Sequence, residues 1–323
     1  MATLAGPIKE ILEAKPRRIQ GKSARFWHEA IAGWALVSPW AIGFLVFTLV
    51  PMVLSFWFCF THYNGVEWPP KWGGLYNFEF LFENLRFKKS VYNTLYYGLI
   101  STPLAIVGSL LLALMLNQRI PGKEAFRTIY YLPAVLSEVP RAMLWLWLLN
   151  PRIGLVNVAL RAIGIAHPPN WLFDSQWAKP AMILMRMWSL GSGAVIFLAG
   201  LQGIPEHLLE AAEVDGANRW QRFWHVTIPL LSPTVFFQIV TSLIAVFQVF
   251  GAIYVWSLHV GGTTGAGPQD SLLFYAYYLY IVAFQEFRMG RASAMAWMMF
   301  IFILILTLIQ FRLARRWVYY EAE

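Results

Sequence analysis

Long uncharged runs of apolar residues limit what this chain can fold into more than any other feature. The clearest run, residues 30–61, contains no Asp, Glu, Lys or Arg. A helix needs about 20 apolar residues to cross the hydrocarbon core of a bilayer. Of the 323 residues, 58% are hydrophobic and only 13% are charged, which leaves too little polar surface to cover a core in water. The chain is therefore predicted to be an all-α integral membrane protein.

Six segments are long and apolar enough to be spans. The predicted spans are about 30–61, 91–117, 128–149, 180–201, 227–254 and 292–311, within a membrane domain of residues 30–315.

Two regions depart from a simple span. Pro39 and Pro51 predict a tilted or kinked first helix. Segment 271–285 is uncharged but only 15 residues long, which suits an interfacial or a re-entrant segment better than a span.

The distribution of basic residues predicts the orientation. With six spans and a cytoplasmic N-terminal tail, 1–29, the inner segments hold 14 Lys and Arg in 75 residues, against 9 in 94 for the outer segments. This follows the positive-inside rule and places the C-terminal tail, 316–323, in the cytoplasm as well. The net charge of +8 is explained by this arrangement, so it does not indicate a nucleic-acid partner.

The loop between the fourth and fifth predicted spans carries the signals of two short helices. Pro205 suits the first turn of a helix, and Gly216 suits its end, where a left-handed residue is common. Asn218 is a good N-cap for a second helix. By themselves these signals also fit an interfacial amphipathic helix with Trp220 and Trp224 among the lipid headgroups.

The spacing within this loop, 203–226, resembles the EAA coupling loop of binding-protein-dependent ABC importer permeases, whose pattern is EAA-x3-G-x9-I-x-L-P. Val226 replaces Ile and Ile228 replaces Leu, and both changes keep size and polarity. The matching residues are Glu210, Ala211, Ala212, Gly216 and Pro229, with Asp215 before the glycine.

A second stretch resembles the outer loop and the start of the last span in carbohydrate-type permeases. It comprises 261–271, Tyr275, Phe284 and 290–294. The chain is similar to the first permease subunit of maltose, lactose and glycerol-3-phosphate importers over about residues 30–315. This resemblance implies the type I ABC importer permease fold in a prokaryotic cytoplasmic (inner) membrane.

The same resemblance implies a function and a set of partners. The chain would move a sugar or oligosaccharide from an extracytoplasmic solute-binding protein into the cytoplasm by alternating access, together with a second homologous permease and two ABC ATPase subunits. The ATPase cleft would receive Glu210, Ala211, Ala212, Asp215 and Gly216. The alternative cargo is glycerol-3-phosphate or a polyol.

ATP hydrolysis is expected in the separate ATPase subunit, which would bind ATP and Mg²⁺, and no cofactor is expected in this chain. A phosphate-binding loop needs G-x-x-x-x-G-K-[ST], and Gly21-Lys22-Ser23 lacks the first glycine because Pro16 occupies it. A rival function is a polytopic enzyme acting on lipid-linked sugars. It would need paired catalytic acids, and the one acidic cluster, in the loop at 206–215, fits docking better.

Three charged residues lie inside predicted spans, where charges are costly and often functional. Glu138 and Arg141 are three residues apart, so they either neutralise each other or line a pathway. Arg186 has no acid within a turn, and we expect it to reach a lipid headgroup, a carbonyl or the partner subunit.

Polar side chains also follow one face of the fifth predicted span. They are Gln238, Thr241, Ser242 and Gln248. Such residues either hold helices together or line a hydrophilic pathway, and neutral amide and hydroxyl groups would suit a hydroxyl-rich substrate.

Overall fold

A computed structural model describes residues 24–118, 121–260 and 265–319. The described residues form helices and loops, with one isolated antiparallel bridge between Thr61 and Trp72. Backbone contacts divide the chain into two units, 1–55 and 56–323. Most of the predicted N-terminal tail and half of the predicted C-terminal tail lie outside the described residues.

The first unit contains one long helical segment. It consists of α2 (Ala24–Phe44), the π turn η1 (Leu45–Leu49) and the start of α3 (Val50–Phe58). The helix continues through Pro39, and the π turn comes just before Pro51. A π turn is one way in which a helix departs from regular geometry. None of the side chains described between 24 and 55 is buried, as expected for an apolar helix that faces lipid.

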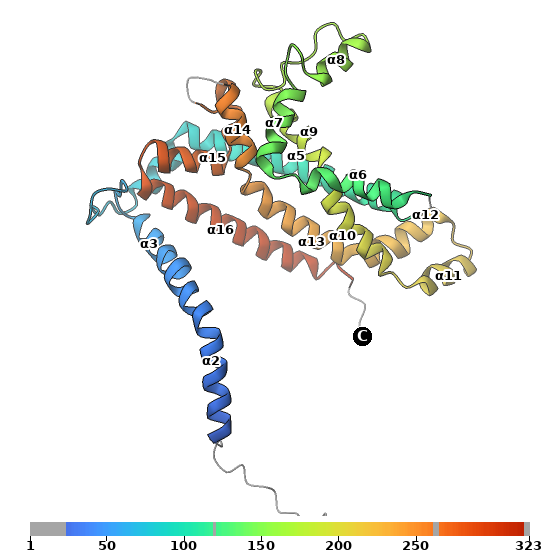
Figure 1. Ribbon diagram of the computed structural model, residues 1–323, viewed down its shortest axis with the longest axis horizontal. Coiled ribbons are helices and arrows are strands. Elements are labelled where there is room, and N and C mark those ends of the chain that lie inside the picture. The colour runs from blue at the N-terminus through green and yellow to red at the C-terminus, as the bar shows by residue number, and fades with distance from the viewer. Residues whose placement is uncertain (1–23, 119–120, 261–264, 320–323) are drawn as a thin grey trace, which may run out of the picture. The chain divides into compact units, whose positions relative to one another are not determined.

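The second unit contains the remaining helices (Figure 1). They are α4 (Tyr76–Glu83), α5 (Leu85–Leu116), α6 (Lys123–Val135), α7 (Glu138–Leu148), α8 (Leu155–Ala162), α9 (Ala178–Trp188), α10 (Gly191–Gln202), α11 (Glu206–Val214), α12 (Arg219–Arg222), η2 (Phe223–Thr227), α13 (Ile228–Phe247), α14 (Gly251–Val260), η3 (Pro268–Asp270), α15 (Tyr275–Tyr280), η4 (Ile281–Gln285) and α16 (Met289–Ala314).

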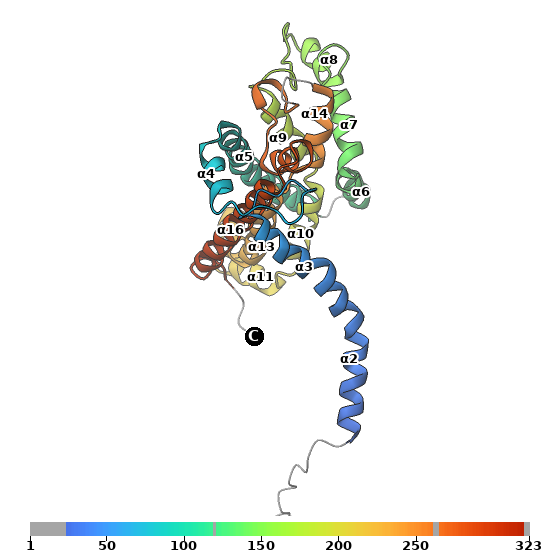
Figure 2. The same cartoon turned by 90° about the vertical axis from the view of Figure 1, so that its left-hand side faces the viewer.

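Helix α5 lies at the centre of this unit. Asn84 caps it by accepting a hydrogen bond from the Phe87 N–H, and its length is packed against α9, α10, α13 and α15. Helices α13 and α16 run side by side (Figure 1), while α14 packs against α7. Helices α8 and α11 lie at opposite ends of the unit (Figure 2).

Within the described residues, four helical segments are long and apolar enough to cross a membrane. They are Glu29–Phe58, Leu85–Leu116, Arg219–Val260 and Met289–Ala314. Helices α9 and α10, bent by 44° at their junction, form a fifth if they are counted as one span. These segments cover five of the six predicted spans.

The third predicted span is divided in the structure. Helix α6 ends at Val135 and α7 begins at Glu138. Between them, Ser137 has the extended backbone of an N-cap, with φ −62° and ψ 157°. Pro140 then falls in the first turn of α7, where its missing N–H has no intrahelical partner to lose. A count of six spans therefore stays a prediction.

Segment 271–285 is packed inside the protein. It forms α15 and η4, and most of its side chains are buried. The Tyr275 hydroxyl donates a hydrogen bond to the Met295 carbonyl of α16. An interfacial helix would expose one full face, so this burial favours the re-entrant alternative.

Two clusters of buried apolar side chains hold the unit together. The larger joins the first half of α5 to α14, α15 and the start of α16. The smaller joins the end of α5 to α10 and the start of α13, around Phe197 and Leu231. The Tyr319 N–H also donates to the Ser232 hydroxyl, which fixes the end of the described chain beside the start of α13.

Candidate functional site

The predicted coupling loop begins with α11, whose C-terminus is closed by a Schellman motif. Gly216 has φ +82°, the left-handed conformation that favours glycine. Its N–H donates to the Glu213 carbonyl, and the Ala217 N–H donates to the Ala212 carbonyl. Helix α11 therefore ends where the sequence predicted.

The second loop helix is capped by Asn218. Its side chain accepts from the Gln221 N–H at 2.9 Å, and the Gln221 side chain accepts from the Asn218 N–H at 2.8 Å, which completes a capping box. Helix α12 then continues through the π turn η2 into α13 without a loop. The predicted second helix is thus present, but it is continuous with the fifth span.

The exposed surface of the loop is acidic and apolar. Glu210, Ala211, Asp215 and Gly216 are exposed, and Ala212 is half-buried. An ion pair between Arg222 and Glu213 ties α12 to α11. Among the exposed apolar side chains, Val214 is 88% and Trp220 is 68% accessible.

Glu138, predicted inside the third span, lies in the first turn of one helix and contacts the first turn of another. It belongs to the first turn of α7, and its Oε1 accepts a hydrogen bond from the Ala252 N–H of α14 at 3.0 Å. No ion pair joins Glu138 to Arg141 in the part of the chain that the structure describes. The two residues therefore form no direct ion pair within the described chain, and their roles in mutual neutralisation or in a pathway stay predictions.

The two arginines of the predicted spans bind hydroxyl groups on other helices. Arg186 Nη1 donates to the Ser101 hydroxyl of α5 at 2.7 Å, and its guanidinium lies 5.7 Å from the centre of the Tyr97 ring. Arg141 Nη1 donates to the Ser189 hydroxyl at 3.3 Å. Arg186 therefore has a partner on α5, and its expected contact with a headgroup, a carbonyl or the partner subunit stays a prediction.

These charged residues share one cavity of about 150 Å³. Its lining includes Tyr97, Glu138, Arg141, Arg186 and Ser189, together with the exposed residue Ala245. The fold thus brings together Glu138 and Arg141 of the third predicted span and Arg186 of the fourth.

The predicted polar stripe on the fifth span is only partly continuous. Gln238 is buried and donates to the Gly193 carbonyl of α10 at 3.0 Å, which is a packing contact. Thr241 donates to the Phe237 carbonyl of its own helix, and Ser242 is half-buried. Gln248 is exposed and follows the end of α13, so it does not extend the helical face.

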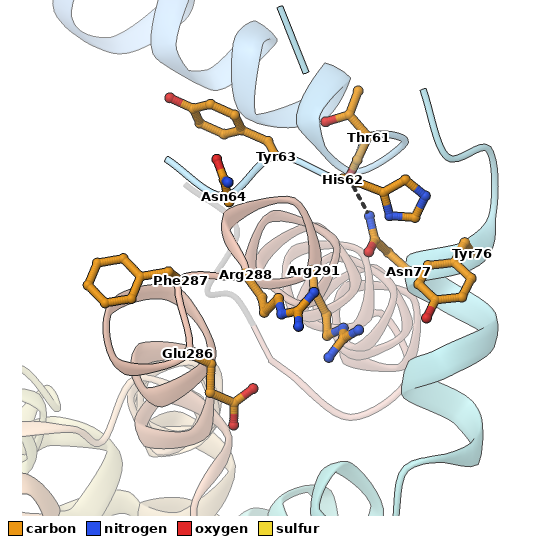
Figure 3. Close-up of a pocket in the computed structure, with 10 residues that line it drawn as sticks. All are labelled: Thr61, His62, Tyr63, Asn64, Tyr76, Asn77, Glu286, Phe287, Arg288 and Arg291. Carbon is orange, nitrogen blue, oxygen red and sulfur yellow. Dashed lines mark hydrogen bonds between the residues drawn. The ribbon is translucent and has the colours of Figure 1, made fainter. Parts of the chain in front are cut away.

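A second pocket, of about 340 Å³, was not predicted (Figure 3). It lies between the loop after α3, the start of α4 and the start of α16. Figure 3 shows the side chains of Arg288 and Arg291 next to each other, and the Arg291 guanidinium lies 3.5 Å from the centre of the Phe80 ring. The sequence did contain one signal for this pocket. Two arginines come just before the sixth predicted span, in an outer segment, where the positive-inside rule predicts few basic residues.

The second sequence match also has a structural basis where it is described. The Gly290 N–H donates to the Tyr63 carbonyl, and a Cβ at Gly290 would lie 2.2 Å from the Thr61 carbonyl oxygen. Glycine is therefore required at this close approach. Phe284 is exposed, and residues 261–264 lie outside the described residues.

Comparison with known proteins is consistent with this arrangement. The family model described as "Binding-protein-dependent transport system inner membrane component" matches residues 85–319. The probable ABC transporter permease protein YesP of Bacillus subtilis (strain 168) is 39% identical over 304 residues, which are 94% of this chain and 96% of that protein. The lactose transport system permease protein LacF of Rhizobium radiobacter is 32% identical over 289 residues, 88% of this chain and 94% of that protein.

A solved structure has the same fold. It is a chain of the bacterial alginate ABC transporter in complex with alginate pentasaccharide-bound periplasmic protein. The TM-score is 0.76 at 28% identity, over 90% of this chain and 98% of that chain. The chain therefore belongs to the family of inner membrane components of binding-protein-dependent transport systems, and it is an ABC transporter permease rather than an enzyme.

Proposed function

We propose that this permease moves a sugar or oligosaccharide from a solute-binding protein into the cytoplasm. The proposal is supported by the relative named for lactose and by the structural neighbour named for alginate. The neighbour also binds a periplasmic protein that holds the saccharide. Two separate ABC ATPase subunits bind ATP and Mg²⁺, and no cofactor is assigned to this chain.

The observation that carries the proposal is the construction of the loop between α10 and α13. Helix α11 ends in a Schellman motif, α12 begins with a capping box, and α12 continues into α13. A force applied to the exposed face that contains Glu210, Ala211 and Asp215 would reach α13 through the capped turn at 215–218 and the Arg222–Glu213 ion pair, and then through the continuous helix of α12 and η2. This construction suits a loop that follows the closure of an ATPase.

The same loop supports the proposed partners. Glu210, Ala211, Ala212, Asp215 and Gly216 dock in a cleft of one ATPase subunit. Because the chain has one such loop and two ATPases must be coupled, a second homologous permease supplies the other loop. Closure of the ATPases then alternates the access of the pathway between the two sides of the membrane.

The fold supports a cytoplasmic position for this loop and for the C-terminus, and the basic residues of 1–29 support the same position for the N-terminus. The end of α5, the end of α10 and the start of α13 meet in the smaller apolar cluster, and Tyr319 is bonded to Ser232 beside them. The segments that follow or precede these ends are the predicted inner ones, which are rich in basic residues. The alternative cargo, glycerol-3-phosphate or a polyol, uses the same architecture.

The experiment is ATP-driven saccharide uptake by cells that carry Glu210→Arg or Gly216→Pro. The first reverses a charge on the docking face, and the second forces a conformation that the left-handed turn does not allow. We expect uptake to fall at least tenfold with an unchanged amount of permease in the membrane. Glu83→Arg, an exposed acid on α4, is the matched control. Normal uptake in both loop variants would refute the coupling role.

A pull-down from native membranes in mild detergent tests the partners independently. We expect an ABC ATPase, a second permease and a solute-binding protein to be recovered with this chain. Recovery of the chain alone after crosslinking would argue against an importer.

A further inference from the structure

Four basic residues lie along or beside the contact between α5 and α9 with no acidic partner. We call Lys89, Lys179, Arg186 and Arg141 the cation track. No ion pair of these four residues is found within residues 24–118, 121–260 and 265–319. The one carboxylate in the cavity beside Arg141 and Arg186 is Glu138, and it is already bonded to the Ala252 N–H. The track therefore carries an excess of positive charge.

The cations alternate with tyrosine rings. Lys179 Nζ lies 5.8 Å from the centre of the Tyr92 ring and 5.4 Å from that of Tyr96. Seven residues further along α9, Arg186 lies over the ring of Tyr97. Seven residues are two helical turns, or about 10 Å along the axis. Along the contact between α5 and α9, a cation thus lies beside tyrosine rings at two positions, first at Lys179 and then at Arg186.

Packing alone does not account for this charge. Within the described residues, Arg186 and Arg141 have only neutral hydroxyl partners, Ser101 and Tyr97 for Arg186 and Ser189 for Arg141, and the Arg141 Nε is buried without a partner. Both arginines are half-buried; a guanidinium partly removed from water without a counterion is costly, and a neutral polar residue would join the same helices at a smaller cost. Membrane orientation does not account for it either, because the positive-inside rule concerns cytoplasmic segments.

We infer that the transported saccharide is anionic and that its carboxylates are bound by Lys179 and then by Arg186 and Arg141. The inference rests on the proposed function and names its substrate class, oligosaccharides that contain uronic acid. A guanidinium matches a carboxylate with two parallel hydrogen bonds, and the apolar face of a pyranose ring packs against tyrosine. A cavity of about 150 Å³ in a protein interior holds roughly one six-membered ring. The remaining sugar units of the oligosaccharide extend out of the cavity next to Ala245, which is exposed.

The test uses the complete transporter, purified through this permease with its ATPase, partner permease and solute-binding protein, in proteoliposomes. ATP-driven uptake is measured for labelled disaccharides of galacturonate, glucuronate, mannuronate and guluronate, for their neutral counterparts, and for glycerol-3-phosphate. We expect uptake of at least one uronate and no competition by its neutral counterpart. This comparison needs no variant.

Variants then assign the effect to the track. We expect Arg186→Gln and Arg141→Gln to raise the KM for the uronate at least tenfold, and Arg186→Lys to restore part of the loss. Lys88→Gln, which removes one exposed positive charge from the same helix α5, should leave the KM unchanged. An unchanged KM in both arginine variants would overturn the inference.

The outcomes separate this inference from the proposed function. ATP-driven uptake of neutral saccharides alone would overturn the inference and leave a sugar importer. Uptake of glycerol-3-phosphate alone, or no ATP-driven uptake of any saccharide, would overturn both.

Discussion

The carboxylate of Glu138 accepts a hydrogen bond from the backbone N–H of Ala252 at 3.0 Å, across 114 residues of sequence. Glu138 is in the first turn of α7, and Ala252 is in the first turn of α14. Helix N-termini carry unpaired N–H groups and a partial positive charge, so one carboxylate stabilises both helices. This double role explains how an acid is accommodated within the third predicted span.

Replacing Gly251 by alanine should break this link. A Cβ at Gly251 would lie 2.6 Å from Glu138 Oε2, so the carboxylate must move away from the Ala252 N–H. We expect a loss of about 1–3 kcal/mol, the usual cost of leaving a buried polar group unpaired. The measurement is the midpoint of thermal unfolding in detergent. Gly43→Ala, where no atom lies within 4 Å of the added Cβ, is the control, and equal midpoints for the two variants would contradict the prediction.

Removing the cap of α12 should weaken coupling without preventing insertion. Asn218→Ala removes the acceptor for the Gln221 N–H, which costs a helix about 1 kcal/mol. Because α12 connects the docking face to α13, we expect ATP-driven uptake to fall several-fold at a constant membrane level of the protein. Asn218→Asp retains the acceptor and should retain uptake. Equal uptake by the alanine and aspartate variants would show that the cap is irrelevant to coupling.

The buried amide of Asn93 should be essential for the packing of segment 271–285. Its Nδ2 donates to the carbonyls of Asp270 and Leu273 at 2.9 and 3.0 Å. Leucine has a similar size but leaves both carbonyls without this donor, and we expect a loss of about 1–3 kcal/mol. Limited proteolysis near residue 270, compared between Asn93→Leu and the control variant Asn170→Leu, whose side chain is exposed, is the measurement. Identical cleavage rates would argue against the anchoring role.

Local signals in the sequence were sufficient for the coupling loop. A left-handed residue after a helix and an Asn before the next depend on the neighbouring backbone alone, so Gly216 and Asn218 were assigned correctly. The apolar runs likewise placed α5 and α16, because the bilayer sets the length of a span whatever its neighbours are.

Interactions between distant segments were not predictable in the same way. The partner of Arg186 is Ser101, 85 residues away, and nothing in the pattern of either helix specifies that they meet. The end of α6 at Val135 depends on the extended backbone at Ser137, which the long apolar pattern of 128–149 concealed. The pocket beside Arg288 and Arg291 needs the loop after α3 to close it, so composition alone did not reveal it.

The π turn at Phe223–Thr227 has a consequence for the direction in which the acidic loop faces. A π turn contains one residue more than the α-helical turn that it replaces, and one residue corresponds to about 100° of rotation around a helix axis. The π turn therefore rotates the side chains of α12 about the helix axis relative to those of α13. In an unbroken α-helix, the side chains of α12 would point in different directions from those that they take here. Deleting one residue from this turn would keep the helix continuous and still rotate the loop, so a single residue of helical register sets the direction in which the proposed docking face, the exposed side of 206–216, points.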